Sequence, residues 1–125
     1  MFNAVGLARD DKAGRIAQMA QNWYSFGAPV QLFTYTRKYM GPPQWSDMGM
    51  WLQTVMLLLR EEGLDSCAQE IWARYGEFMK GQLGIDDDHI FFCGMAIGYR
   101  NAEAPINTFA VPRVAMGEVV RFEGF

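Results

Sequence analysis

The stretch MGPPQWSDMGMWLQTVMLLLREEGLDSCAQEIW at residues 40–72 decides the fold of this chain. After its Gly-Pro-Pro turn, the pattern predicts a helix over residues 46–62, capped by Ser46 or Asp47, because a short polar side chain accepts from the free amides of a first helical turn. Apolar side chains cover nearly the whole circumference of this helix, and such a helix is buried on all sides. They are Met48, Met50, Trp51, Leu52, Val55, Met56, Leu57, Leu58 and Leu59. One domain of 125 residues can barely surround this helix, so we expect a partner subunit to cover it.

The end of the same stretch predicts another helix. Gly63 is expected to end the first helix in the left-handed conformation. Ser66 and Gln69 match the capping-box pattern S-x-x-Q, in which each side chain pairs with a free amide at a helix start. We therefore expect a helix over residues 67–80 that stops at Gly81.

The residues before this stretch predict one helix and one strand. Asp10 or Asp11 can cap a helix that runs to about Trp23, because apolar residues recur there at helical spacing. The sequence SFGAP at residues 25–29 breaks this helix. The sequence VQLFTYT at residues 30–36 is typical of a strand, because it is rich in β-branched and aromatic residues.

The residues after the stretch predict the centre of a sheet. The sequence IFFCGMAIGY at residues 90–99 is apolar on both faces of a strand, which is typical of a central position. We expect an extended loop over residues 100–112 and one more short strand over residues 119–122. Two or three strands with three helices predict an α+β fold with an antiparallel-type sheet.

Length and composition favour one domain over residues 1–125. Half of the residues are apolar, which gives the chain ample apolar surface for a core. The chain also contains four Trp, five Tyr, nine Phe and nine Met residues. This high load indicates that a partner subunit or a flat ligand covers part of the surface.

Charge and the scarcity of metal ligands exclude several classes of protein. Eleven basic and fourteen acidic residues give a net charge of -3, and no basic cluster could neutralise a phosphate backbone, so we expect no nucleic-acid partner. Residues 61–88 hold eight acids and two bases, which predicts a solvated acidic face. Cys67 and Cys93 are expected to be reduced and buried. His89 is the only histidine, and no spacing around it suits a metal site or a nucleophilic pair.

Targeting signals are not expected in this chain. The start MFNAVGLARDDK lacks the basic region and long apolar run of a secretory signal. The longest apolar stretch, at residues 48–59, is too short for a membrane span and is interrupted by Gln53 and Thr54. We therefore expect a cytoplasmic protein without a membrane partner.

Several collinear segments together resemble the FMN-dependent nitroreductase family. They are FGAPV at 26–30, the stretch at 40–72, FFCGMAIGYR at 91–100, the API-N segment at 104–107, Arg113, and RFEGF at 121–125. The resemblance covers nearly the whole chain and corresponds to the C-terminal half of the family domain. It implies a partial nitroreductase-like α+β fold, a long buried central helix at a subunit interface, and a homodimer with the flavin in that interface.

The resemblance also implies where FMN binds. In the family, the turn after the central helix supplies backbone amides beside the isoalloxazine ring, and here that turn is CAQE at residues 67–70. Unpaired amides at a helix start are suitable donors. We therefore expect the backbone of Ala68, Gln69 and Glu70 to bind the flavin, or else simply to cap a helix. Arg113 is expected to bind the FMN phosphate, because a guanidinium suits a bidentate contact; a surface arginine is the alternative.

No catalytic side chain is expected, because flavin chemistry needs no dedicated acid or base from the protein. Trp45, Trp51 and Trp72 are expected to be core or interface residues. The family's Arg- and Ser-rich N-terminal segment, which grips the FMN phosphate and ribityl chain, has no counterpart in these residues.

Three functions remain open on the sequence alone. The first is an FMN-dependent oxidoreductase that uses NADH or NADPH to reduce nitroaromatics, quinones or related small-molecule acceptors. The second is a truncated family member that acts without flavin as a non-enzymatic homodimer or partner-binding protein. The third is a small α+β binding domain for another flat ligand.

Overall fold

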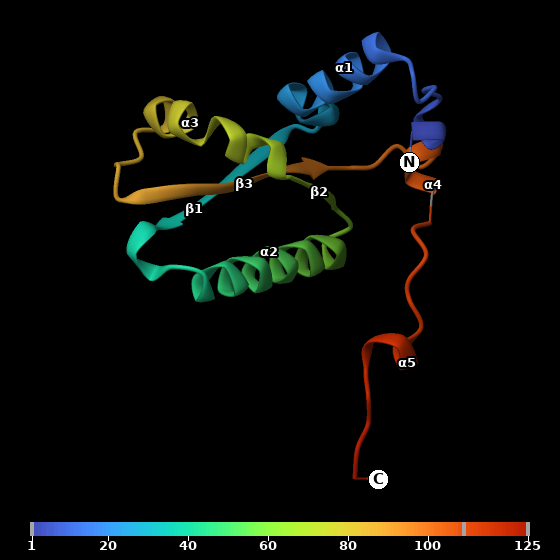
Figure 1. Ribbon diagram of the computed structural model, residues 1–125. Helices are drawn as coiled ribbons and strands as arrows, with labels where there is room; N and C mark the ends of the chain where they lie inside the picture. The colour runs from blue at the N-terminus through green and yellow to red at the C-terminus, as the bar shows by residue number, and fades with distance from the viewer. Residues whose placement is uncertain (1, 109, 125) are drawn as a thin grey trace. The chain divides into compact units, whose positions relative to one another are not determined.

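The computed structural model describes residues 2–108 and 110–124 (Figure 1). The chain divides into two compact units, residues 10–100 and residues 1–9 with 101–125. The larger unit contains the sheet. The smaller unit contains three short helices, η1 (Phe2–Val5), α4 (Pro105–Thr108) and α5 (Met116–Val119). A single family domain over residues 1–125 remains a prediction.

Three antiparallel strands form the sheet of the larger unit. They are β1 (Val30–Arg37), β2 (Asp65–Gln69) and β3 (His89–Gly98), in the order β1-β3-β2. The predicted central position of β3 is confirmed, because β3 pairs with β1 on one side and with β2 on the other. The predicted α+β class with an antiparallel sheet is confirmed as well.

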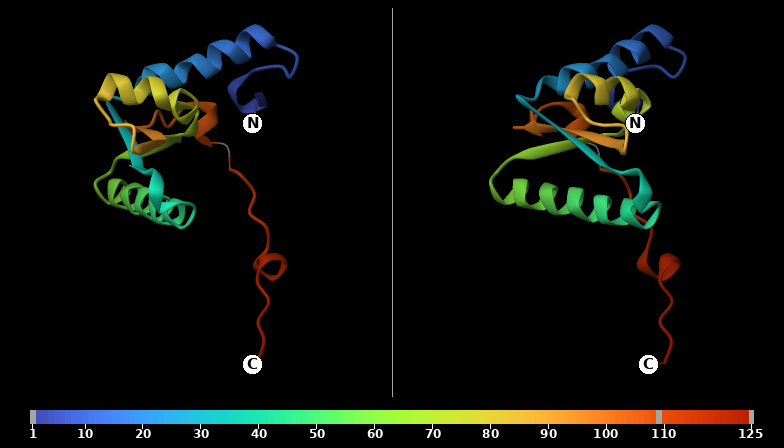
Figure 2. Two further views of the ribbon diagram at one scale, coloured as in Figure 1. Left: turned by 60° about the vertical axis from the view of Figure 1, so that its left-hand side comes forward. Right: turned by 90° about the vertical axis from the view of Figure 1, so that its left-hand side faces the viewer.

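Helices lie on both faces of this sheet (Figures 1 and 2). The helix α2 (Pro43–Glu61) covers one face, and the helices α1 (Lys12–Ala20) and α3 (Gly76–Leu83) lie on the other. The buried core between α2 and the sheet consists of Leu52, Cys93 and Met95. Because successive side chains of a strand point to opposite faces, Cys93 and Met95 face α2 whereas Gly94 faces away from it.

The ladder between β1 and β3 contains one irregularity. Thr34 lies opposite Cys93 and Tyr35 lies opposite Phe91, so Phe92 has no opposite residue. Between these two pairs β3 therefore contains one residue more than β1, which is the geometry of a β-bulge. The extra residue packs against the core on the α2 side.

The first helix is confirmed at its start and changes character at its end. The Asp11 carboxylate accepts a hydrogen bond of 2.8 Å from the Gly14 amide, which makes it the cap of α1. The chain then continues as the 3-10 segment η2 (Gln21–Gly27). Within η2, Ser25 and Phe26 have φ of 51° and 53°, so the helix is broken where the sequence predicted a break.

The helix expected over residues 67–80 is wrong at its start. Residues 65–69 are the strand β2, a 3-10 turn η4 (Glu70–Tyr75) follows, and α3 begins only at Gly76. Gln69 has an extended backbone (φ −128°, ψ 80°) and caps no helix with its side chain. Pairing with the apolar strand β3 outweighs the local capping pattern, since strand formation depends on cross-strand neighbours. The helix ends at Leu83, and Gly84 in the left-handed conformation terminates it instead of Gly81.

The chain by itself buries only one side of the long helix, and the predicted cover of its other side by a partner subunit stays a prediction. The helix begins at Pro43, three residues before the expected cap, and Gly63 beyond its end has the expected positive φ of 75°. Within α2, whose residues are all described, Leu52 is the one buried side chain. The outer side of α2 exposes Met50, Trp51, Leu57 and Leu58. Nothing in the chain's larger unit covers this side, because α2 packs on the sheet with its inner side alone.

The last part of the chain differs from its prediction in one element. The loop expected over residues 100–112 contains the single turn α4, and the strand expected over residues 119–122 is absent from these described residues. The helix α5 ends at Val119 and extended backbone without a strand partner follows it. A lone strand needs a neighbour for its backbone groups, which explains why apolar residues alone do not make one here.

Candidate functional site

Three of the four predicted site residues lie together where β2 meets η4. Ala68 and Gln69 are the last residues of β2, and Glu70 is the first residue of η4. Because β2 is an edge strand of the described sheet, its amides that point away from β3 have no ladder partner there. Ala68 and Glu70 are exposed. The predicted residues therefore lie at a strand edge and at the first residue of a 3-10 turn.

Gln69 is fixed in place by its side chain. It is 2 % exposed, and its Nε2 donates to the backbone oxygen of Asn22 at 3.0 Å and to Asn22 Oδ1 at 3.3 Å. Its Oε1 is buried without a hydrogen-bond partner among the described residues. A buried acceptor without a partner costs free energy, so this atom is a candidate for contact with a group outside the chain.

The two thiols lie on either side of this junction in different environments. Both cysteines are free, but Cys67 is exposed and Cys93 is buried, so the expectation of two buried thiols is wrong for Cys67. Burial raises the pKa of the Cys93 thiol, and a hydrogen bond from the Gln69 backbone partly opposes the rise. Burial of part of its surface also raises the pKa of the Cys67 thiol. Neither thiol is therefore activated as a nucleophile.

Trp72 connects the junction to the sheet. Its ring meets Trp23 at 4.8 Å and Phe33 at 5.2 Å between centroids, both edge to face. A Cβ added to Gly94 would lie 2.4 Å from Trp72 Cδ1, so the indole packs directly on the glycine backbone. The Nε1 atom of Trp72 is buried without a hydrogen-bond partner among the described residues. These are the contacts of a core residue, which is one of the two roles expected for Trp72.

The structure also shows an aromatic pocket that the sequence analysis did not identify. A hollow of about 360 Å³ is lined by Trp23, Trp72, Tyr75 and Phe78. Trp23 and Tyr75 meet edge to face at 5.0 Å between centroids. Trp72, Tyr75 and Phe78 follow one another at intervals of three residues, and this spacing places side chains on one side of a helical segment. This three-residue spacing is the sequence pattern from which the pocket could have been predicted.

The other two tryptophans are exposed in this chain. Trp45 is 51 % and Trp51 is 47 % exposed, and both belong to α2. Their expected place in a core is therefore wrong within the chain, and their place in an interface remains a prediction.

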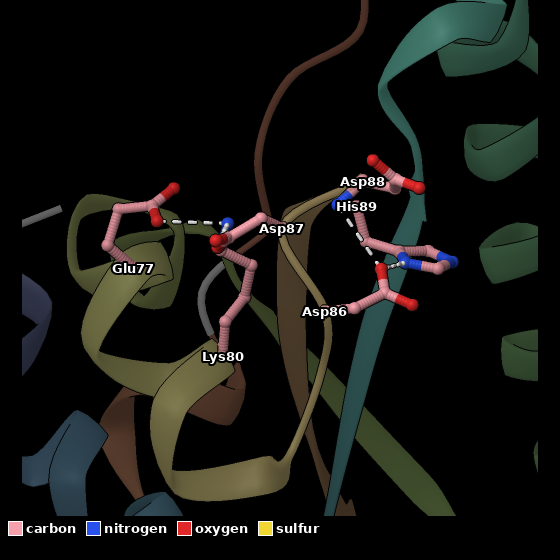
Figure 3. Close-up of polar contacts among 6 residues, drawn as sticks. All are labelled: Glu77, Lys80, Asp86, Asp87, Asp88 and His89. Atoms are coloured by element: carbon pink, nitrogen blue, oxygen red, sulfur yellow. Dashed lines mark hydrogen bonds and ion pairs between the residues drawn. The ribbon is translucent and has the colours of Figure 1, made fainter.

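A polar cluster lies at the turn between α3 and β3 (Figure 3). Asp86 hydrogen-bonds His89 through Nδ1, and this bond holds the pKa of the Asp86 carboxyl below its usual value. Lys80 is buried, and its ammonium pairs with Glu77 at 2.9 Å and Asp87 at 3.5 Å, which raises its pKa. Among residues 2–108 and 110–124, no group of three or more His, Cys, Asp or Glu side chains could hold a metal ion. The cluster therefore fixes the turn that leads into the central strand.

Arg113, the fourth predicted site residue, belongs to the smaller unit. It is exposed, and its Nη1 donates to the backbone oxygen of Val111 at 3.3 Å. A guanidinium has five donors, so this single bond leaves capacity for an anion. Its predicted contact with a phosphate stays a prediction.

The residues at the junction suit one edge of a flavin ring. An isoalloxazine edge presents both acceptors and an N–H donor, so it needs backbone donors and an acceptor on the protein. Ala68 and Glu70 are exposed residues there, and Gln69 carries an unpartnered acceptor. The fit concerns the ring edge alone, since the polar chain of FMN needs further donors.

A three-stranded antiparallel sheet with helices on both faces defines an α+β domain. The chain belongs to the Nitroreductase family, whose family model matches residues 7–99.

Solved structures share the fold closely. The chain is 58% identical to the FMN and NADPH-dependent nitroreductase NfnB from sphigopyxis sp. strain HMH, with a TM-score of 0.95 over 99% of this chain and 56% of that one. It is 26% identical to the FMN-dependent nitroreductase NfnB from Mycobacterium smegmatis, solved in complex with NADPH, with a TM-score of 0.93 over 98% of this chain and 55% of that one.

Curated relatives include enzymes named for nitroaromatic substrates. The 4-nitrobenzoate reductase of Pseudomonas putida is 36% identical over 115 residues, which are 92% of this chain and 51% of that protein. The chloronitrobenzene nitroreductase of Comamonas testosteroni is 30% identical over 96% of this chain and 53% of that protein. The chain therefore spans about half the length of the curated relatives it matches.

The helices of the described residues are short or polar by membrane standards. None of them has the length and apolar character needed to cross a bilayer.

Proposed function

We propose that this chain is part of an FMN-dependent oxidoreductase that uses NADH or NADPH to reduce nitroaromatics, quinones or related small-molecule acceptors. The carrying observation is the 58% identity, over 99% of the chain, to a solved FMN and NADPH-dependent nitroreductase. The junction of β2 and η4 supports it, because the exposed residues Ala68 and Glu70 flank Gln69, whose side-chain acceptor has no partner among the described residues.

In this proposal the chain binds and orients the cofactor and performs no acid or base chemistry itself. FMN held by these residues would supply the redox chemistry, which is hydride acceptance from a reduced nicotinamide and electron transfer to the acceptor. The backbone of Ala68 and Glu70 donates to the ring edge. Gln69 holds this backbone in place through its two hydrogen bonds to Asn22.

Arg113 is proposed to bind the FMN phosphate. Its guanidinium is permanently charged and can hold two phosphate oxygens at once. Replacing Arg113 by Ala is expected to weaken FMN binding by about 10-fold, since hydrogen bonds to charged groups contribute about 1.5–3 kcal/mol. Fluorescence titration of FMN measures this, and an unchanged affinity would assign Arg113 to the surface.

A homodimer is proposed as the working form. The outer side of α2 exposes Met50, Trp51, Leu57 and Leu58, and a second copy of the chain is the proposed cover. Sedimentation equilibrium tests this proposal, and a monomer at all concentrations would contradict it.

The decisive variant for the flavin site is Glu70→Pro. Glu70 is the first residue of η4, a position where proline is well tolerated because its fixed φ suits a helix start. The substitution therefore removes one backbone N–H with little effect on the fold. The matched control Glu70→Gln keeps the N–H and removes the charge.

We expect Glu70→Pro to weaken FMN binding about 10-fold, and Glu70→Gln to leave it nearly unchanged, because a lost hydrogen bond costs about 1–3 kcal/mol. Flavin fluorescence during titration gives the affinity, and far-UV circular dichroism checks the fold. Anaerobic bleaching of the flavin by NADPH, followed by oxidation with 4-nitrobenzoate, tests the redox cycle. Colourless protein that cannot be reconstituted with FMN would refute the proposal for this chain.

A second candidate is a family member without flavin that acts as a non-enzymatic homodimer or partner-binding protein. The observation that favours it is length, because the chain spans 48% to 56% of the length of its relatives. Stable association in the absence of FMN binding is the outcome that would support this candidate over the first.

A further inference from the structure

The segment η2 is hydrogen-bonded to both edge strands of the described sheet. On one side, Gln69 Nε2 of β2 donates to the backbone oxygen of Asn22 at 3.0 Å and to Asn22 Oδ1 at 3.3 Å. On the other side, the Ser25 hydroxyl donates to Gln31 Oε1 of β1. Because β1 and β2 flank the central strand, η2 joins the two edges of the sheet across β3. We call η2 the strap.

The backbone of the strap is held in a strained conformation. Ser25 and Phe26 both have left-handed φ, of 51° and 53°, although each has a Cβ. Such residues persist only where their surroundings fix them. The Ala28 amide donates to the Ser25 backbone oxygen at 2.9 Å, which closes the turn. Trp23 packs edge to face on Trp72, with 4.8 Å between ring centroids. The strap therefore has a defined place on the sheet.

Asn22 connects the strap to the junction of β2 and η4. Its Nδ2 donates to the backbone oxygen of Met19 in α1 at 2.9 Å, while its Oδ1 accepts from Gln69. Gln69 is only 2 % exposed, and its backbone also bonds the buried thiol of Cys93. Gln69 is therefore fixed through its side chain and through its backbone.

We propose that Asn22 is a positioning residue of the flavin site, an inference that rests on the proposed function of the junction. Asn22 acts through Gln69, whose neighbours Ala68 and Glu70 are the proposed backbone donors. A binding site that is ordered before its ligand arrives loses less conformational freedom on binding. Loosening the bond between Asn22 and Gln69 therefore weakens FMN binding.

Three variants separate this role from general support of the fold. Asn22→Leu has nearly the same size and removes both side-chain bonds, but it keeps the backbone oxygen that Gln69 also contacts. Asn22→Asp keeps a side-chain oxygen that accepts from Gln69 and tests rescue. The matched control Ser25→Ala removes the strap's bond to β1, at the other edge of the sheet.

The first measurement contains no flavin. Hydrogen exchange of the Gln69 amide is followed by NMR in the full chain without FMN, since exchange reports local opening. We expect Asn22→Leu to exchange about 2- to 10-fold faster, which is the effect of one lost hydrogen bond. We expect Asn22→Asp and Ser25→Ala to exchange at the rate of the unsubstituted chain. Circular dichroism checks that each variant folds.

The second measurement is the affinity for FMN, obtained by fluorescence titration. We expect Asn22→Leu to bind FMN about 2- to 10-fold more weakly, and Asn22→Asp and Ser25→Ala to bind it as the unsubstituted chain does.

Several outcomes would overturn the role of Asn22. They are an unchanged exchange rate or an unchanged FMN affinity in Asn22→Leu, equal effects of Asn22→Leu and Ser25→Ala, and failure of Asn22→Asp to restore either quantity. Absence of FMN binding by the unsubstituted chain would instead refute the proposed function. The exchange rates distinguish the two failures, because they are measured without FMN.

Discussion

The two faces of the sheet differ in how completely the chain covers them. On the α2 side, Leu52, Cys93 and Met95 form a buried core, and Met95 has no exposed surface. On the opposite side, Trp23, Trp72, Tyr75 and Phe78 surround an open pocket. The same strand β3 therefore contributes to one completed core and one incomplete core.

This difference shows that apolar content alone does not tell how much of a fold is present. Both faces are rich in large apolar side chains. Phe91 and Met79 are buried on the pocket side, but Tyr75 and Phe78 on that side remain 49% and 65% exposed. Free energy is gained when apolar area leaves water, so the α2 side is expected to dominate the stability of this chain. The predictions below test that asymmetry.

The largest effect is expected for Met95→Ala. This side chain is completely buried between α2 and the sheet, so its truncation leaves a cavity and costs about 2–5 kcal/mol of unfolding free energy. The matched change on the other face, Phe78→Ala, removes a side chain that is 65% exposed and is expected to cost much less. Urea denaturation measures both. Equal losses would contradict the asymmetry.

A smaller effect is expected for Gly94→Ala. The added Cβ would lie 2.4 Å from Trp72 Cδ1 and 2.9 Å from Gln31 Nε2. Overpacking of this kind costs about 1–3 kcal/mol. The control Gly49→Ala meets no atom within 4 Å and lies inside α2, so it is expected to stabilise the chain by about 0.5–1 kcal/mol. Thermal unfolding measures both changes. A Gly94→Ala variant as stable as the unsubstituted chain would show that Trp72 and Gln31 can move away from the added Cβ.

The smallest effect is expected from the Asp86–His89 pair, which lies at the start of β3. The pKa of Asp86 is lowered in the folded chain, so the pair stabilises the fold above the carboxyl's ordinary pKa, and this contribution is lost as the pH falls through the lowered value. Asp86→Asn is therefore expected to be less stable than the unsubstituted chain at neutral pH, with the difference vanishing in acid. Denaturation curves between pH 7 and about pH 2 test this, since an Asp carboxyl ordinarily titrates near pH 3.9. A difference independent of pH would contradict it.

Local patterns predicted the elements that depend on local chemistry. The Asp11 cap, the strand at β1, the central position of β3 and the left-handed Gly63 follow from the sequence, because caps, turns and two-sided apolar strands have local signatures. The capping box at Ser66 failed because pairing with β3 is a long-range interaction. A four-residue motif carries no information about a strand that lies far away in the sequence and pairs with it.

The candidate site was predictable as a segment but not as a geometry. The resemblance indicated Ala68, Gln69 and Glu70, and the structure places all three at one junction. The anchoring of Gln69 by Asn22 joins residues 47 positions apart, which no spacing rule covers. The aromatic pocket was missed for the same reason, since Trp23 meets Trp72 and Tyr75 only in the folded chain.

The bulge at Phe92 has a consequence for how this strand tolerates insertions and deletions. A deletion within a regular strand turns every later side chain to the opposite face. Phe92, in contrast, has no opposite residue in β1, so its removal would restore a regular ladder while Phe91 and Cys93 keep the faces they already occupy. Evolution can therefore gain or lose a residue at this position of the central strand without exchanging the two cores. At the bulge, the length of β3 can change by one residue while the other side chains of the strand stay on the same faces of the sheet.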